Sequence, residues 1–274
     1  MDIKFELNQG SNHIYIPVYV NDKGPFQFCV DTGATATTLS KSLVDRLGIR
    51  TYPNETIEVS IPAMRAAVDS LKIGAEVLQT TEVLVIDFAE LLRPCGGAME
   101  GIIGFSTLKN YKMSVNYNTK VLKLEISASD ESKSSNLLQW RKFEYADGTH
   151  LVTFPTFINN RGPFDFVVDT GAGGTIVTQE LAEKLGLMLN QGQGQIQCVG
   201  IGGNAGGSFA VLERLSVANV TQEKAPAVVL DLKAVTRRGS SVRYGILGYP
   251  FLKDIELIID YPAKRFAVVD LRRS

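Results

Sequence analysis

The chain of 274 residues is an internal repeat, and this limits what it can fold into more than any other feature. From Gly24 to Ile49, 13 of 26 positions are identical to Gly162–Leu187, at an offset of 138 residues. The match resumes at an offset of 144, where Gly-Ile-Ile-Gly at 101–104 pairs with Gly-Ile-Leu-Gly at 245–248. The second copy has therefore gained six residues, at a point corresponding to about 59–71 of the first. Two similar halves predict two lobes related by a pseudo-two-fold axis.

A polar, serine-rich stretch at 127–136 separates the two copies and is typical of an exposed linker. The sequence therefore predicts an N-terminal lobe at 1–126 and a C-terminal lobe at 137–274. Each half is large enough to bury a core of its own.

The residue pattern within each half is mostly that of β-strands. Runs rich in β-branched and aromatic residues predict strands in both copies, at 13–20, 83–86, 120–126, 151–158, 227–230 and 265–270. Asn, Asp and Gly at 21–24 and 159–162 predict hairpin turns. One short helix is expected in each half, at 40–47 and 178–185, each followed by glycine. The fold class predicted is all-β with one short helix per half.

The tetrapeptide Asp-Thr-Gly-Ala occurs at 31–34 and again at 169–172, each time directly after an apolar strand. A carboxylate in such a place is costly to keep unless the site uses it. Because two-fold symmetry brings equivalent residues together at the axis, we expect Asp31 and Asp169 to meet.

The overall composition points to no charged partner. The formal net charge is −1, with 45% hydrophobic and 21% charged residues, so there is no basic excess for nucleic acid or an anionic membrane surface. No apolar stretch approaches the roughly 20 residues that span a bilayer. The first residues carry no signal segment, which as written indicates the cytoplasm. A periplasmic or secreted chain with its leader removed would look the same, so the compartment stays open.

The few cysteines and histidines form no recognisable catalytic or metal-binding motif. Cys29, Cys95 and Cys198 are scattered and make neither a disulfide framework nor a metal cluster, so we expect no metal and no cofactor. His13 and His150 lie in no motif and are expected to be ordinary structural residues.

Asp-Thr-Gly-Ala after an apolar strand, with two apolar residues and glycine about 70 residues later, resembles the retropepsin-like aspartic peptidases. Both motifs occur in both halves, and the resemblance covers nearly the whole chain. It implies two small acid-protease lobes of the six-stranded-barrel type, fused in one chain as in the pepsin-like relatives. It also implies one active site between the lobes of a monomer, acting on a peptide or protein substrate.

The resemblance assigns catalysis to Asp31 and Asp169. Two carboxylates about 3 Å apart repel by roughly 5 kcal/mol at an effective dielectric near 20, or about four pKa units, so such a pair holds one proton over a wide pH range. This splitting is known for protease dyads. One carboxylate then acts as general base on a bound water, while the protonated partner donates to the carbonyl oxygen.

The neighbours of the two aspartates have implied roles as well. The threonines brace the two loops, the glycines allow the tight turn and the alanines leave room for passing strands: Thr32, Gly33, Ala34, Thr170, Gly171 and Ala172. The apolar-apolar-Gly segments that thread beside the loops, the psi-loops of this family, contribute Ile103, Gly104, Leu247 and Gly248.

The halves differ where this family places its flaps, the hairpins that fold over the substrate. The second half has a glycine-rich run that includes Gly200, Ile201, Gly202 and Gly203. The corresponding stretch of the first half, which includes Ile61 and Met64, has one proline and no glycine. We therefore expect one working flap, from the C-terminal half, and a stiffer N-terminal wall.

Three other interpretations stay open. Actin-like ATPases also repeat a strand-Asp-x-Gly-Thr loop, which binds phosphate, but the strand-rich pattern and the second loop's extra glycines disfavour this reading. A catalytically silent peptide-binding protein of the same fold needs no aspartate pair. A latent form would need a pro-segment, and no obvious one precedes Lys4.

Overall fold

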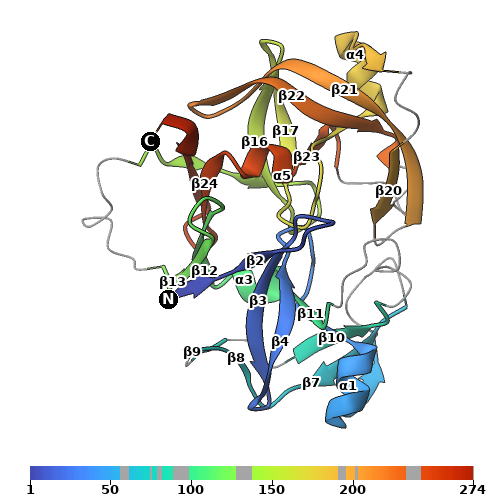
Figure 1. The fold of residues 1–274 in the computed structure, drawn as a ribbon, viewed down its shortest axis with the longest axis vertical. Helices are drawn as coiled ribbons and strands as arrows, with labels where there is room; N and C mark the ends of the chain where they lie inside the picture. Colours follow the sequence, from blue (N-terminus) through green and yellow to red (C-terminus); the bar gives the residue numbers. More distant parts are fainter. Residues whose placement is uncertain are drawn as a thin grey trace.

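The computed structural model has two lobes of like construction, stacked along its long axis and joined by a sheet to which both contribute (Figure 1). It describes residues 1–55, 62–74, 76–78, 82–88, 99–127, 138–190, 196–200, 203–232 and 242–273. The predicted linker lies outside the described residues apart from Ser127, so the domain boundaries stay a prediction.

The described part of the N-terminal lobe consists of short strands and the helices α1 and α3. In chain order its elements are β1 (Asp2–Lys4), β2 (Glu6–Leu7), β3 (Ile14–Val20), β4 (Lys23–Val30), β5 (Thr38–Ser40), α1 (Lys41–Leu47), β6 (Thr51–Pro53), β7 (Met64–Ala67), β8 (Leu71–Ile73), β9 (Glu76–Val77), β10 (Glu82–Ile86), β11 (Gly101–Ile103), α3 (Phe105–Leu108), β12 (Tyr111–Asn116) and β13 (Val121–Ile126).

The C-terminal lobe repeats this order. Its elements are β14 (Arg141–Lys142), β15 (Glu144–Tyr145), β16 (Val152–Ile158), β17 (Arg161–Val168), β18 (Ile176–Thr178), α4 (Gln179–Leu185), β19 (Leu189–Asn190), β20 (Ile196–Gly200), β21 (Gly203–Val217), β22 (Val220–Leu230), β23 (Gly245–Leu247), α5 (Tyr249–Leu252), β24 (Ile255–Asp260), β25 (Arg265–Asp270) and the 3₁₀ turn η4 (Leu271–Arg273).

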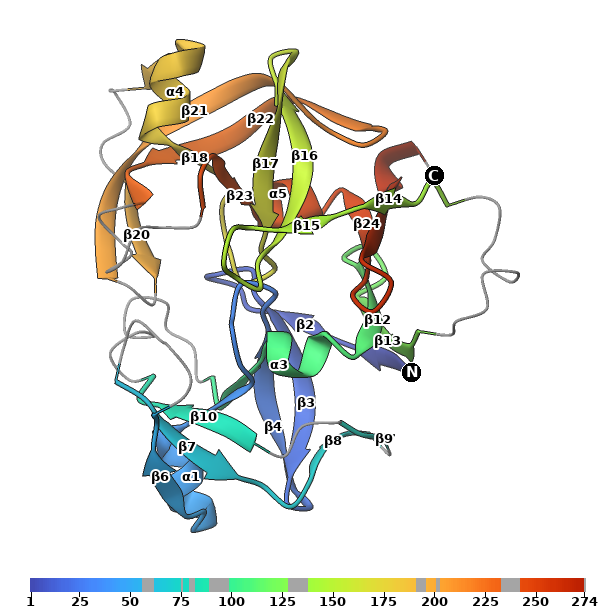
Figure 2. The same ribbon diagram turned by 180° about the vertical axis from the view of Figure 1, so that it is seen from behind.

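The all-β prediction is confirmed, and the strands of the C-terminal lobe close into a barrel. Pairing runs β16-β17-β23-β18-β22-β21 and returns from β21 to β16, a ring of six strands (Figure 2). The N-terminal lobe uses the same order, β3-β4-β11-β5-β10-β7, but the strand corresponding to β21 is broken into β7 and β8. β8 then pairs with β3 in place of the unbroken strand.

A separate six-stranded sheet joins the lobes. Its order is β1-β13-β12-β24-β25-β14, and the antiparallel pair β12–β24 crosses from one half to the other. Both chain termini lie on this side of the molecule (Figure 1). The two halves therefore share hydrogen-bonded backbone as well as side-chain contacts.

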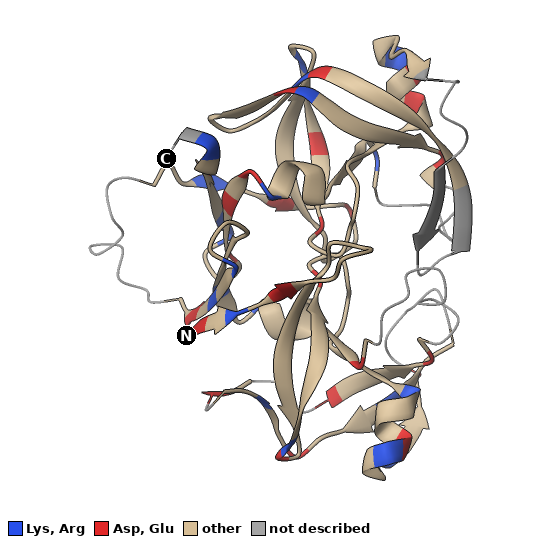
Figure 3. Cartoon of the chain, viewed as in Figure 1, with Lys and Arg blue, Asp and Glu red and all other residues tan. Residues whose placement is uncertain are grey.

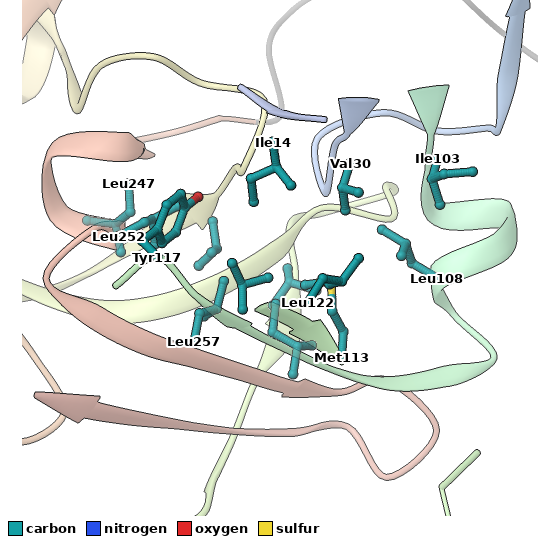
Figure 4. Packing of buried hydrophobic residues seen from close by; sticks show 14 of the residues in the cluster. Ile14, Val30, Ile103, Leu108, Met113, Tyr117, Leu122, Leu247, Leu252 and Leu257 are labelled. Atoms are coloured by element: carbon teal, nitrogen blue, oxygen red, sulfur yellow. The ribbon is translucent and has the colours of Figure 1, made fainter. Parts of the chain in front are cut away.

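The apolar core is likewise continuous across the halves. One cluster of buried residues includes Val30 and Leu122 of the first half and Leu247 and Leu257 of the second (Figure 4). Such burial contributes roughly 25 cal/mol for each Å² of apolar surface removed from water. The relative placement of the lobes is thus fixed by a common core.

The predicted helices are present, and each half has a further helix within its described residues. Ser40 caps α1 by accepting a hydrogen bond from the Leu43 amide at 3.1 Å, and Gly48 ends it in the left-handed region at φ 68°. Gly186 ends α4 in the same way at φ 67°. The single-turn helices α3 and α5, which follow the apolar-apolar-Gly segments, were not among the sequence expectations.

Strand register locates the six extra residues of the second half. Thr51 pairs with Ala66 in the first half, and Leu189 pairs with Ala210 in the second. The offset is thus 138 at Thr51 and already 144 at Ala66. The added residues therefore lie before Ala66, in the part of the second half that contains the β20–β21 hairpin.

Charged residues of both signs are intermixed along the ribbon (Figure 3). Among the described residues no helix is both long enough and apolar enough to cross a membrane.

Candidate active site

The two Asp-Thr-Gly loops meet at the pseudo-two-fold axis. Asp31 directly follows β4 and Asp169 directly follows β17, so each aspartate leaves the end of a buried strand. The Asp31 amide donates to the Ile103 carbonyl and the Asp169 amide to the Leu247 carbonyl, both at 3.1 Å. The neighbouring parallel strand thus fixes the backbone of each aspartate.

Each carboxyl is held by its own loop and covered by the loop of the other half. The amides of Gly33 and Gly171 donate to Oδ1 of Asp31 and Asp169 respectively, both at 2.8 Å. A Cβ placed on Gly33 would lie 2.7 Å from Oδ2 of Asp169, and one on Gly171 would lie 2.6 Å from Oδ2 of Asp31. No residue larger than glycine fits at either position without displacing the opposite carboxyl.

Thr32 and Thr170 join the loops by four reciprocal hydrogen bonds. Each threonine amide donates to the hydroxyl of the other, at 3.1 Å from Thr32 and 3.0 Å from Thr170. Each hydroxyl donates across the axis, to the carbonyl of Val168 or Val30, at 2.8 Å. Both side chains are buried, so these bonds are shielded from competing water.

The apolar-apolar-Gly segments run beside the loops. Beyond Ile103 and Leu247, Gly104 passes so close to the first loop that a Cβ there would lie 2.5 Å from the Ala36 carbonyl oxygen. A Cβ on Gly248 would overlap the Gly174 carbonyl oxygen in the same way. The carbonyls of Ala34 and Ala172 each accept a hydrogen bond of 2.9 Å, from the backbone amide of the first residue of α3 and of α5 respectively.

The carboxyl pair is placed to share a proton. Both aspartates are half-buried, and burial together with the charge of Asp31 raises the pKa of Asp169 well above its usual range. A hydrogen bond between the two carboxyls acts in the same direction. One proton between two adjacent carboxyls is the state in which one can act as a base while the other donates.

The structure describes only part of the expected flaps. Gly200 and Gly203 pair at the end of the β20–β21 hairpin, which extends from the C-terminal lobe toward the N-terminal lobe (Figures 1 and 2). Ile201, Gly202 and Ile61 lie outside the described residues. Met64 lies in β7 and is 40% exposed. A role in substrate binding for these residues stays a prediction.

Sequence reasoning missed the two histidines. His150 Nε2 lies 3.2 Å from the Gly33 carbonyl oxygen, and the His13 imidazole lies close enough to the Gly171 backbone for that backbone to raise the pKa of the ring. Each histidine thus contacts the glycine of the opposite loop. Because the partner is a backbone group from the other half, no local motif marks either residue. The only signal was that each lies just before the first strand of the hairpin whose second strand ends at the aspartate of its own half.

Comparison with known proteins agrees with the two-lobed, repeated architecture of the chain. The sequence model of a family described as aspartyl protease matches twice, at residues 16–107 and 154–251, once in each half. No curated protein sequence matches the chain. Among solved structures, an aspartic proteinase from Irpex lacteus has a TM-score of 0.55 and 13% identity, covering 98% of this chain and 97% of that one. At that identity the likeness shows a shared two-lobed fold and nothing finer.

Proposed function

Because the chain belongs to the aspartyl protease family, we propose that it is an aspartic endopeptidase with one active site between its two lobes. The observation that carries the proposal is the meeting of the two Asp-Thr-Gly loops, with each glycine against the opposite carboxyl. Since one chain supplies both aspartates, we expect the monomer to be the active form. The proposed substrate is a peptide or an unfolded protein segment, and no cofactor is required.

In the proposed mechanism Asp31 and Asp169 share one proton. The ionised carboxylate takes a proton from a water held between them, and the water oxygen attacks the scissile carbonyl carbon. The protonated carboxyl donates its proton to the carbonyl oxygen as that oxygen gains negative charge, which gives a tetrahedral gem-diol. The C–N bond then breaks as the carboxyl that took the water proton gives it to the leaving nitrogen, and one hydroxyl of the gem-diol returns a proton to the other carboxylate, which restores the singly protonated pair. Because the pair titrates as a unit, the roles belong to the pair rather than to fixed residues.

The neighbouring residues support these steps by holding geometry. Thr32 and Thr170 bind the two loops together, and Gly33 and Gly171 let the carboxyls approach. Gly104 and Gly248 bring the flanking backbone close enough to keep each loop in place. Such preorganisation avoids rearrangement during the reaction.

The β20–β21 hairpin is the proposed cover for the substrate. It extends from one lobe toward the other, on the side opposite the six-stranded sheet (Figure 1). We assign to its tip, at 200–203, the role of the mobile flap, and to the N-terminal segment around Met64 the role of a fixed wall. Faster amide exchange at 64–66 than at 203–206 would contradict this assignment.

The direct test is cleavage of an unfolded protein and a peptide library between pH 3 and 7, with and without a statine-type inhibitor. Asp31→Asn and Asp169→Asn should each lower turnover by at least about a thousandfold, because the mechanism needs a base and an acid at one place. Appreciable activity in either single variant would contradict a shared dyad. Binding of peptides by the wild-type chain without cleavage would support the silent binding protein instead. The all-β fold and the family match do not favour the actin-like reading.

Unfolding measurements on Asp169→Asn supply the folding control. The pKa of Asp169 is raised in the folded chain, so its stabilising contribution is complete below the unfolded value near 3.9 and is lost as the pH rises through the folded value. Asparagine cannot ionise. The variant should therefore unfold at higher denaturant concentration than the wild type at pH 7, and show no such gain at pH 3. A variant that is inactive and also less stable at pH 7 would point to misfolding.

A further inference from the structure

The only two histidines of the chain both reach across the lobe boundary to the active-site loops. His13 precedes β3 and contacts Gly171, while His150 precedes β16 and contacts Gly33. Both rings are half-buried. Each histidine contacts the loop of the other half, as Thr32 and Thr170 do.

The two histidines do not occupy equivalent positions in the repeat. The Asn8 amide donates to the His13 carbonyl at 3.0 Å, and in the second half the Ala146 amide donates to the Leu151 carbonyl at 2.8 Å. The counterpart of His13 is therefore Leu151, and that of His150 is an asparagine. Simple copying of one ancestral histidine would not give this pattern.

A backbone difference explains the shift by one residue. Asn12, the counterpart of His150, lies in the left-handed region at φ 60°, where asparagine is favoured. In the segment before β16 the residue in the left-handed region is instead Gly148, at φ 68°. The two loops turn differently, yet each brings an imidazole to the opposite glycine.

Both loops are held firmly enough to position a ring. The Asn8 side-chain oxygen accepts from the Gly10 and Ser11 amides at 2.9 and 3.0 Å. A Cβ on Gly173 would lie 2.9 Å from the Ser11 carbonyl oxygen, so this loop packs directly on the opposite active-site loop. In the other half the His150 ring packs against Phe105, 5.3 Å between centroids.

We propose that His13 and His150 are positioning residues of the dyad, each fixing the glycine that lies against the carboxyl of its own half. His150 holds Gly33, which covers Asp169, and His13 holds Gly171, which covers Asp31. The two rings thereby set the separation of the carboxyls. The inference rests on the proposed function for its catalytic consequence, and on the cross-lobe contacts for its structural one.

Protonation of the two rings adds a second effect. Burial lowers the pKa of both histidines, and Asp31 opposes that shift in each case. The rings are therefore neutral donors at neutral pH and become cations beside Asp31 in acid. A cation there favours the singly ionised dyad, which extends activity to lower pH.

The other titratable groups of this region are weaker influences on the rings. Asp169 and the buried Cys29 thiol lie at the dyad, and burial raises the pKa of Cys29. The phenols Tyr117, Tyr145 and Tyr261 line the adjoining aromatic clusters, where burial raises the pKa of each. All of these groups other than Asp169 are neutral across the acid range in which the histidines titrate.

An NMR titration of the wild-type chain labelled with ¹⁵N-histidine tests the contacts without reference to activity. Two ring systems should appear, both titrating below the ordinary value near 6.5, and both should shift further down in Asp31→Asn. Rings that titrate near 6.5 and do not respond to Asp31→Asn would overturn the inference. This readout survives even if the chain proves to cleave nothing.

Paired variants then test the catalytic consequence. His13→Leu and His150→Leu remove both the donor and the charge, and should lower kcat roughly five- to tenfold with little change in KM, the factor expected for one net hydrogen bond. His150→Gln keeps an amide donor in place of Nε2–H. It should retain kcat near pH 6 but move the acid limb of the pH profile up by about half a unit, leaving the alkaline limb unchanged.

Phe154→Leu is the control for a general loss of core packing, because Phe154 is buried and its ring stacks on that of Phe266. It should lower stability while leaving the pH profile of the folded enzyme unchanged. Leucine variants with wild-type kcat and pH profile would overturn the inference, as would a Phe154→Leu profile that shifts like that of His150→Gln.

Discussion

The two Asp-Thr-Gly loops are alike where they touch each other, but they differ in the side-chain hydrogen bonds that each makes with its own lobe. In the first half the Thr37 hydroxyl bonds to the Thr107 hydroxyl at 2.6 Å and accepts from the Gly104 amide at 3.2 Å. In the second half the counterpart of Thr107 is Phe251, and the buried Thr175 hydroxyl has no hydrogen-bond partner among the described residues.

The same contrast recurs one residue away. The Ser106 hydroxyl accepts from the Thr37 amide at 2.9 Å, whereas its counterpart in α5 is Pro250. By contrast, the cross-axis bonds of Thr32 and Thr170 agree to within 0.1 Å. The two halves thus share the contacts that each loop makes with the other, whereas at these positions one lobe has polar hydrogen bonds and the other has Pro250 and Phe251.

The largest expected effect tests a close backbone contact that each half makes within its own lobe. Gly104→Ala and Gly248→Ala should each destabilise the chain by about 3 kcal/mol, because the added methyl overlaps backbone that cannot rotate away. Urea unfolding of both variants measures this. A cost at only one of the two sites would mean that the loops are not equally close-packed.

The intermediate effect tests the part of the comparison that is asymmetric. Thr37→Val should cost about 1–3 kcal/mol, since it leaves the Gly104 amide and the Thr107 hydroxyl without this partner. Thr175→Val should lie within about 0.5 kcal/mol of the wild type or be stabilising, because that hydroxyl is already unpaired in the described part of the chain. Thermal unfolding of the two variants should therefore differ clearly. Equal losses would show that Thr175 has a polar partner after all.

The smallest expected effect compares the helices that follow the loops. Ser40→Ala should cost about 1 kcal/mol, because Ser40 caps α1. Thr178→Ala should cost less, since its hydroxyl donates instead to the carbonyls of Arg243 and Tyr244. Amide exchange gives the sharper readout: Leu43 should exchange faster in the first variant, and Leu181 should be unaffected in the second. Faster exchange of both amides would show that Ser40 and Thr178 cap their helices in the same way, which would contradict the difference described here.

The sequence predicted the features that depend on the repeat itself. Two apolar strands ending in Asp-Thr-Gly, in matching halves, required Asp31 and Asp169 to approach each other, because only the pseudo-two-fold axis relates them. The helices after the loops followed from local capping residues, and the strands from β-branched runs.

Other features depend on contacts that no local pattern contains. The break between β7 and β8 depends on which strands the two pieces pair with, β10 for β7 and β3 for β8. Helix α3 is only one turn long, too short for helical periodicity to show. His13 and His150 were taken as ordinary because their partners are main-chain groups more than a hundred residues away. Residue types in a sequence can predict contacts between side chains. A backbone carbonyl is present in every residue, so the sequence does not show which carbonyl a distant histidine will contact.

The β20–β21 hairpin lies where the second half is six residues longer than the first, and this difference has a consequence for direction. A peptide chain has a polarity, from amino to carboxyl end, that a site with true two-fold symmetry cannot distinguish. In the proposed enzyme this hairpin lies on one side of the dyad, and the corresponding segment of the other half is six residues shorter. The two ways of laying a peptide across the dyad are therefore physically different, and each lobe is committed to one side of the scissile bond.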